Sequence, residues 1–285
     1  MPGQNSSSET SARKILFPVH ARMIRVLALA VLWSMTCTLG ISSTPTAEPA
    51  PHPSPPIDFK HLPWSNGETL SYLVSWTAFE AAEGTFVAKD KGDHWEFNLT
   101  LASRGLVDSF YPFTGNFWSI LLPSPWRSTE YGEYRFEPRC VIKERTQIDY
   151  SQHQGTREIW NEGKTKTFPI AEDAVDDLGT MLYHLRAGPW KPGDKRTIYV
   201  YESNSEKQAE AECQGRETRS FGTWPSQPLL RILVLPTKGT HHRGHLRLWM
   251  TDDARHLPLH AELEFRYGTF DIDLIKADKL LPLGH

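Results

Sequence analysis

From Glu68 onward, apolar and polar residues alternate with a period of two, and this pattern limits the possible folds more than any other feature of the chain. Residues 69–76 read TLSYLVSW, in which every second side chain is large and apolar. The same alternation recurs in six further segments: His94–Leu101, Ile142–Tyr150, Arg196–Tyr201, Leu229–Leu235, His245–Met250 and Leu259–Tyr267. Gly, Pro, Asn and Asp clusters separate them and supply turn residues. Alternation of this kind predicts half-buried antiparallel strands.

One segment follows a helical period instead. Residues 176–187 read DDLGTMLYHLRA, with Leu178, Met181, Leu182 and Leu185 at helical spacing. Asp176 can cap the start and Gly188-Pro189 ends the pattern. A shorter helical turn is expected over Gly105–Tyr111. The sequence therefore predicts a mainly β fold, either a large antiparallel barrel or two packed antiparallel sheets, with one amphipathic helix at about 176–187.

The N-terminal part of the chain has the pattern of an export signal. Residues 26–33, VLALAVLW, form an apolar run that follows Arg22 and Arg25, and small residues come after it. A basic start and a short apolar stretch are typical of a secretory signal, which we place at residues 23–43. Because Met23 begins this pattern, residues 1–22 are interpreted as a mis-assigned extension. An uncleaved inner-membrane anchor is the alternative.

A proline-rich linker follows at residues 44–60, where TPTAEPAPHPSPP has no capacity to form a core. Residues 61–285 are then expected to form a single β-rich domain. The predicted location is the periplasm, with membrane contact that is transient or made through the leader. A lipid anchor on Cys37 is not favoured, because the residues before it match a lipid-attachment site poorly.

Composition and motifs exclude several functional classes. The formal net charge is -3, so the chain lacks the basic surface that nucleic-acid binding requires. We find no G-x-S-x-G nucleophile motif and no glycine-rich phosphate loop, so no catalytic residue and no cofactor is predicted. Cys140 and Cys213 form an even pair in an oxidising compartment, and they are interpreted either as a disulfide or as two unpaired cysteines.

Three polar clusters have a functional and a structural interpretation. In the cluster of His241, His242 and His245, His241 and His245 would share one face of a strand and could bind a metal, but no third ligand such as Cys or Asp lies nearby, and a polar hairpin tip is favoured over a metal site. Residues 252–255, DDAR, could bind a cation, but aspartates at a strand end usually bond their own backbone. The acidic residues of the third cluster are interpreted as a solvated strand face: Glu206, Glu210, Glu212 and Glu217.

An aromatic stretch of the chain is the candidate ligand-binding region. Its residues are Phe110, Tyr111, Phe113, Phe117, Trp118 and Trp126. One interpretation places them in the core of the sheet. The other places them in the wall of a lipid-sized cavity, since larger barrels enclose apolar ligands and such sites are lined by aromatic groups.

The order of several motifs resembles the domain-of-unknown-function family numbered 3108. The resemblance covers about residues 64–275 and rests on five blocks: Trp64–Tyr72 (WSNGETLSY), Gly105–Pro112 (GLVDSFYP), Asp177–Arg186 (DLGTMLYHLR), Lys191–Asp194 (KPGD) with Gly215–Thr218 (GRET), and, most specifically, Leu248–Pro258 (LWMTDDARHLP). It implies an exported bacterial β-rich protein without an established activity, and therefore no catalytic residues. The prolines of residues 222–228 depart from the family pattern, and we expect them to delay the next strand until Leu229.

Three functions are compatible with this sequence. The favoured one is non-enzymatic binding of an apolar or amphipathic, lipid-like ligand or another envelope component. The second is an interaction module of an envelope complex, which would bind a protein partner through an exposed sheet edge. The third is a hydrolase whose Asp, Glu and His residues come together only in the fold.

Overall fold

The structure is a computed structural model, and it describes residues 61–77, 79–172, 175–202, 205–238, 244–265 and 268–283. These residues belong to one compact unit, Cys37–His285. The predicted extension, leader and linker, and the histidines His241 and His242, lie outside the described residues. Within the described ranges, no helix is long and apolar enough to cross a membrane.

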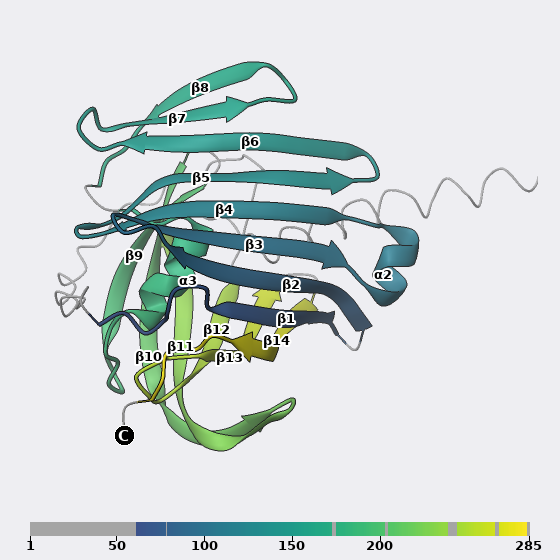
Figure 1. Ribbon diagram of the computed structural model, residues 1–285, viewed down its shortest axis with the longest axis vertical. Helices are drawn as coiled ribbons and strands as arrows, with labels where there is room; N and C mark the ends of the chain where they lie inside the picture. The colour runs from purple at the N-terminus through teal and green to yellow at the C-terminus, as the bar shows by residue number, and fades with distance from the viewer. Residues whose placement is uncertain are drawn as a thin grey trace, which may run out of the picture. The chain divides into compact units, whose positions relative to one another are not determined.

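Fourteen antiparallel strands form one continuous sheet in the described part of the chain (Figure 1). They are β1 (Thr69–Trp76), β2 (Phe79–Asp90), β3 (Trp95–Ser103), β4 (Thr114–Pro123), β5 (Trp126–Glu137), β6 (Cys140–Asp149), β7 (Gln154–Ile159), β8 (Lys164–Pro169), β9 (Lys195–Glu202), β10 (Ser205–Phe221), β11 (Trp224–Lys238), β12 (His245–Thr251), β13 (Pro258–Phe265) and β14 (Gly268–Asp278). Their spatial order is β8-β7-β6-β5-β4-β3-β2-β1-β14-β13-β12-β11-β10-β9. Every pair of neighbours except β1 and β14 is consecutive in sequence, so the sheet is built almost entirely from hairpins.

The mainly β prediction is confirmed, and the single sheet corresponds to the barrel rather than to two packed sheets. The predicted principal helix is α3 (Leu178–Arg186), and the short turn is α2 (Gly105–Phe110). The delayed start of the strand at Leu229 is wrong, because β11 begins at Trp224. Before Leu229 this strand is paired only with β10, as in the pair Thr218–Pro228, and a strand with one neighbour tolerates proline.

The sheet curls until its two edge strands come close together. Phe168 of β8 and Tyr201 of β9 stack with ring centroids 4.7 Å apart, and the Tyr201 hydroxyl donates to the Pro169 carbonyl at 2.5 Å. The chain that follows β8 then pairs with β9 through a parallel bridge between Asp176 and Val200. These contacts close the sheet into a barrel-like wall.

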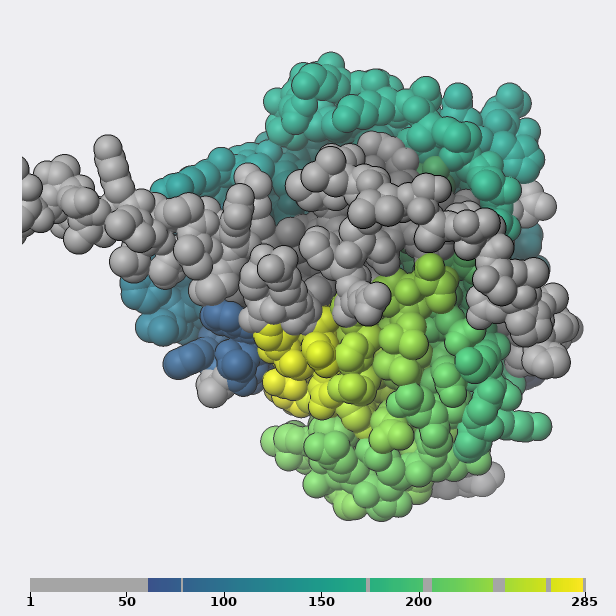
Figure 2. Space-filling view, turned by 180° about the vertical axis from the view of Figure 1, so that it is seen from behind, coloured from purple at the N-terminus to yellow at the C-terminus, as the bar shows by residue number. Residues whose placement is uncertain are grey.

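Helix α3 lies inside this wall and contacts β3, β4 and β9, which belong to opposite parts of the sheet (Figure 1). Its apolar side chains Met181 and Leu185 pack against the inward residues of β9–β13. On the other side Tyr183 stacks on Phe97 of β3, with centroids 3.8 Å apart. The helix therefore fills one end of the barrel. Seen from behind, β9–β14 form the adjoining green-to-yellow surface (Figure 2).

Of the two interpretations of Cys140 and Cys213, the structure has the unpaired one, since both cysteines are free. Cys140 is exposed at the start of β6. Cys213 lies on β10 and is enclosed in the apolar core beneath α3. The strands β6 and β10 are not neighbours in the sheet, so the two thiols point into different surroundings.

Candidate functional site

The six aromatic residues singled out in the sequence do not form one wall. Phe110 is 75% exposed at the end of α2, whereas Phe113 and Phe117 are buried. Phe117 and Trp118 are consecutive on β4 and therefore point to opposite faces of the sheet. Trp126 lies under α3, where its Nε1 donates to Asp176 Oδ1 at 2.8 Å and its ring packs against Trp64.

Trp118 belongs to an aromatic cluster on the outward face of β4–β7. Its ring lies 5.1 Å from Tyr134 and 6.4 Å from Trp160, which is 40% exposed. Gly132 allows this arrangement, because a Cβ atom there would lie 2.3 Å from the Trp118 ring and 2.5 Å from the Glu144 carbonyl. The cluster covers a glycine in the sheet and does not face the interior.

The inward face of this wall is identified by the side chains that bond α3. Ser119 of β4 and Ser128 of β5 donate to the Asp177 carboxylate, at 2.5 and 2.6 Å. Residues directly opposite each other in an antiparallel pair share a face, and alternate residues along a strand do so too. The pairs Ser119–Tyr131, Phe117–Glu133 and Gly115–Arg135 are therefore inward.

A group of charged side chains lies on this inward face, further along β5 than Ser128 and on the neighbouring strands β6 and β7. The Arg135 Nε atom lies 3.5 Å from Glu133 and 3.3 Å from Glu137, and the Tyr111 hydroxyl donates to Glu137 at 2.6 Å. On the next strands, Arg157 of β7 pairs with Glu144 of β6 at 2.5 Å. We call Glu133, Arg135, Glu137, Glu144 and Arg157 the charged wall.

Burial makes Glu133 the most perturbed carboxyl of the charged wall. Its side chain is 18% exposed. Desolvation raises the pKa of Glu133 to about 7, although the positive charge of Arg135 acts in the opposite direction. This carboxyl therefore changes charge near neutral pH, and such groups gather at functional sites more often than elsewhere.

Apolar residues adjoin the charged wall on the same face. The register pairs Phe117 with Leu99, and Gly115 with Leu101. Leu99 and Leu101 are buried, and Gly84 of β2 lies directly beside them. The inward face beyond α3 thus combines an apolar strip from β2–β4 with charged side chains from β5–β7. Such a face can hold a molecule that has both an apolar and a polar part.

The remaining inward polar groups have structural roles around α3. The Asp176 carboxylate accepts from Trp126, as described above, and lies 2.6 Å from His184 Nδ1. Asp177 caps the helix by accepting from the amides of Gly179 and Thr180. These contacts satisfy the two buried carboxylates and hold the start of α3 against the sheet.

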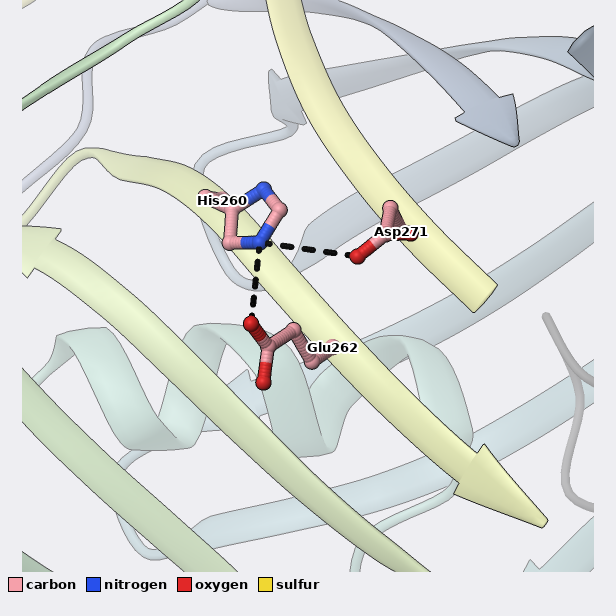
Figure 3. Close-up of side chains that lie close together, drawn as sticks. All are labelled: His260, Glu262 and Asp271. Carbon is pink, nitrogen blue, oxygen red and sulfur yellow. Dashed lines mark ion pairs between the residues drawn. The ribbon is translucent and has the colours of Figure 1, made fainter. Parts of the chain in front are cut away.

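A separate polar group lies on the outward face of β13 and β14. His260, Glu262 and Asp271 point toward one another, with His260 Nε2 3.8 Å from Glu262 and 3.9 Å from Asp271 (Figure 3). Their potential ligand atoms all lie within 4.8 Å of one another. Histidine and carboxylates are ligands for divalent transition metals. In the part of the chain that the structure describes, this group is the candidate metal centre.

The polar clusters expected from the sequence have other roles. His245, the described member of the histidine cluster, pairs with Glu264 at 3.1 Å. Asp253 accepts from the backbone amide of Arg255, two residues ahead, so residues 252–255 form the expected turn. On the acidic strand face, Glu210 and Glu212 pair with Lys195, at 2.8 and 3.5 Å.

Comparisons with known proteins agree with this architecture. The model of the family described as protein of unknown function, DUF3108, matches residues 71–275. The chain belongs to this family. The resemblance seen in the sequence is thereby confirmed, and it extends over the β-sheet and α3.

The fold of this DUF3108 protein is similar to solved structures, of which 10 chains match. One is the beta-barrel-like protein of domain of unknown function DUF1849 from Brucella abortus, at a TM-score of 0.54. It is 6% identical, and the similarity covers 75% of this chain and 97% of that one. No curated protein matches. This structural similarity supports a barrel-like fold and gives no information about activity.

Neither the charged wall nor the group of His260, Glu262 and Asp271 in this DUF3108 chain was predicted from the sequence. Three residues of the charged wall, Glu133, Arg135 and Glu137, lie on β5, which has no apolar alternation and was not predicted as a strand. Glu144 of β6 and Arg157 of β7 join them only through the register of the sheet. His260 and Glu262 lie two residues apart on a predicted strand, and this spacing could have indicated a shared face. Their partner Asp271 could be found only from the register of β13 with β14.

Proposed function

We propose that the protein is exported to the periplasm and binds an amphipathic, lipid-like ligand on the inward face of its sheet, without catalysing a reaction. The observation that carries the proposal is the joining of the charged wall to the apolar strip of Phe117, Leu99 and Leu101. The leader pattern at residues 23–43 supports the compartment.

The side chains of the inward face indicate how an amphipathic ligand would be oriented. Its acyl or otherwise apolar part would contact the strip of β2–β4, where about 25 cal/mol is gained per Å² of apolar surface removed from water. Its head group would lie against Arg135 and Arg157, whose guanidinium groups can bond a phosphate or carboxylate with two parallel hydrogen bonds. Protonation of Glu133 near neutral pH would reduce repulsion of an anionic head group.

Lipid analysis of the exported protein tests this proposal. The full chain is expressed with its own leader in a Gram-negative bacterium, purified from the periplasm, and examined by native mass spectrometry and lipid extraction. We expect a bound amphipathic lipid in the wild type, and uptake of an anionic phospholipid from vesicles after delipidation. A protein that carries no lipid and takes none from vesicles would contradict the proposal.

Matched arginine variants locate the site. Arg135→Gln should lower lipid uptake by about tenfold to a hundredfold, since loss of a charged hydrogen bond costs about 1.5–3 kcal/mol, whereas Arg135→Lys should retain part of it. Arg145→Gln is the control, because Arg145 lies on the outward face of the adjacent strand, next to Trp160. Equal uptake by the Arg135→Gln and Arg145→Gln variants, with unchanged circular dichroism, would exclude the charged wall as the head-group site.

A further inference from the structure

The register of β13 and β14 places four potential ligand residues at the corners of a small rectangle. His260 and Glu262 are two residues apart on β13, so their side chains share the outward face. Asp273 is opposite His260, and Asp271 is opposite Glu262. Cross-strand partners lie about 4.5–5.5 Å apart at Cβ, a separation that lets their side chains converge.

The His260 ring is held so that one nitrogen faces the two carboxylates. Nδ1 lies 2.8 Å from Asp273 Oδ1, and this hydrogen bond fixes the orientation of the ring. Nε2 is directed into the gap between Glu262 and Asp271, with 3.8 and 3.9 Å to their nearest oxygens (Figure 3). These distances are too long for hydrogen bonds, so Nε2 has no hydrogen-bond partner among these neighbours.

Aromatic side chains enclose the ring from its other sides. Phe221, at the tip of the β10–β11 hairpin, stacks on His260 with centroids 4.4 Å apart, and Trp249 of β12 lies 5.2 Å away. The His260 side chain is 8% exposed, whereas Glu262 and Asp271 are 26% and 35% exposed. The imidazole is thus buried and rigid, while the gap between the carboxylates is open to solvent.

The charges around this gap leave an excess of negative charge. Three carboxylates meet here, and among the described neighbours one cation pairs with them, Arg247, which bonds Glu262 Oε2 at 3.1 Å. Partial burial, together with the charges of Glu262 and Asp273, raises the pKa of Asp271, although His260 acts in the opposite direction. A bound cation would relieve this repulsion.

We propose that His260 Nε2, Glu262 and Asp271 form a binding site for a divalent transition metal such as Zn²⁺, with Asp273 as the residue that orients His260. Metal-binding histidines commonly donate their other ring nitrogen to a carboxylate, as His260 does to Asp273. Tetrahedral Zn²⁺ with bonds of about 2.0–2.1 Å places its ligand atoms about 3.3 Å apart. His260 Nε2 lies 3.8 and 3.9 Å from the two carboxylates, and all three ligand atoms lie within 4.8 Å of one another, so the exposed carboxylates would have to move inward to reach this value.

Three protein ligands leave at least one coordination position for water or another molecule. The site is on the outward face of the sheet, so it is separate from the inward face of the proposed lipid site. Its test does not depend on whether a lipid binds.

Calorimetric titration of the metal-free full chain with ZnCl₂ tests the proposal. We expect one equivalent of Zn²⁺ to bind, with release of protons from the ligand side chains. Glu262→Gln and Asp271→Asn should each weaken binding by tenfold or more, and Asp273→Asn by about tenfold. The matched control is Glu264→Gln, on the same face of β13 and two residues from Glu262, which should bind as the wild type does.

The chemical shifts of the His260 ring nitrogens give an independent readout. Nitrogen-15 spectra should show Zn²⁺ on Nε2 and a proton on Nδ1, in the wild type and in Glu264→Gln. A protonated imidazole that does not respond to Zn²⁺ would show that the group is an ion-pair cluster and would overturn the proposal. Equal Zn²⁺ affinity in Glu262→Gln, Asp271→Asn and the wild type would overturn it as well.

Discussion

Glu133 shows how a single inward side chain links function to stability. Its pKa is raised to about 7 by burial, so the folded protein holds a proton that the unfolded chain has lost above about pH 4.5. Stability therefore falls as the pH rises from about 4.5 to 7, by roughly 3 kcal/mol at most, and stays low above that range. Charged groups placed at a cost in stability are typical of binding sites.

Replacing this carboxyl should flatten the dependence of stability on pH. Glu133→Gln resembles the protonated acid, so its free energy of unfolding relative to the wild type should rise by about 2–3 kcal/mol between pH 5 and pH 8. Urea unfolding at four pH values measures this difference. Glu130→Gln, on the outward face of the same strand, is the control and should follow the wild-type profile. A constant difference between Glu133→Gln and the wild type would show that Glu133 is ionised throughout.

At the scale of elements, α3 is positioned by one carboxylate. Asp177 accepts hydrogen bonds from the amides of Gly179 and Thr180, and also from Ser119 and Ser128 of the wall. One side chain thus caps the helix and attaches its start to β4 and β5. Burial raises the pKa of Asp177, and the hydroxyl and amide donors oppose that rise.

Removing this carboxylate should release the helix from the wall. Asp177→Ala should destabilise the protein by about 3 kcal/mol, because a lost N-cap costs about 1 kcal/mol and unsatisfied buried hydroxyls add about 1–3 kcal/mol. Hydrogen exchange should then accelerate most in α3. Asp108→Ala, in the exposed first turn of α2, should change stability by less than about 0.5 kcal/mol. Uniform acceleration of exchange across the sheet would argue against a local attachment.

The elements differ in how clearly the sequence indicates them. Strands with one apolar face, such as β1 and β3, are visible as alternation, and α3 is visible from its spacing and caps. In β5 the inward residues include Tyr131, Glu133 and Arg135, so a strand that carries the candidate site has no apolar period. In β14, by contrast, Phe270, Ile272 and Leu274 do alternate, and this signal could have been used. Pairing partners such as Glu262 and Asp271 depend on register, which distant contacts determine.

For the whole molecule, a buried ion pair joins parts of the chain that are far apart in sequence. Arg186, the last residue of α3, bonds both carboxylate oxygens of Glu68, at 2.6 and 3.0 Å, just before β1. The same guanidinium donates to the carbonyl of Arg255, in the loop between β12 and β13. Both charged side chains are fully buried. This contact connects the helix, β1 and the second half of the sheet.

Removing one charge of this pair leaves the other buried and unpaired, so the effects of the two single substitutions on stability should not add. Glu68→Gln and Arg186→Met should each destabilise the protein by about 3–5 kcal/mol, because each leaves one uncompensated buried charge. The double variant should be less destabilised than the sum of the two, by about 2 kcal/mol or more, since neither charge then remains. Urea unfolding of the wild type, the two single variants and the double variant measures the four free energies of unfolding of this double-mutant cycle. Strict additivity would show that the two charges are solvated and do not depend on each other, and would contradict the role of this pair in joining the parts of the barrel.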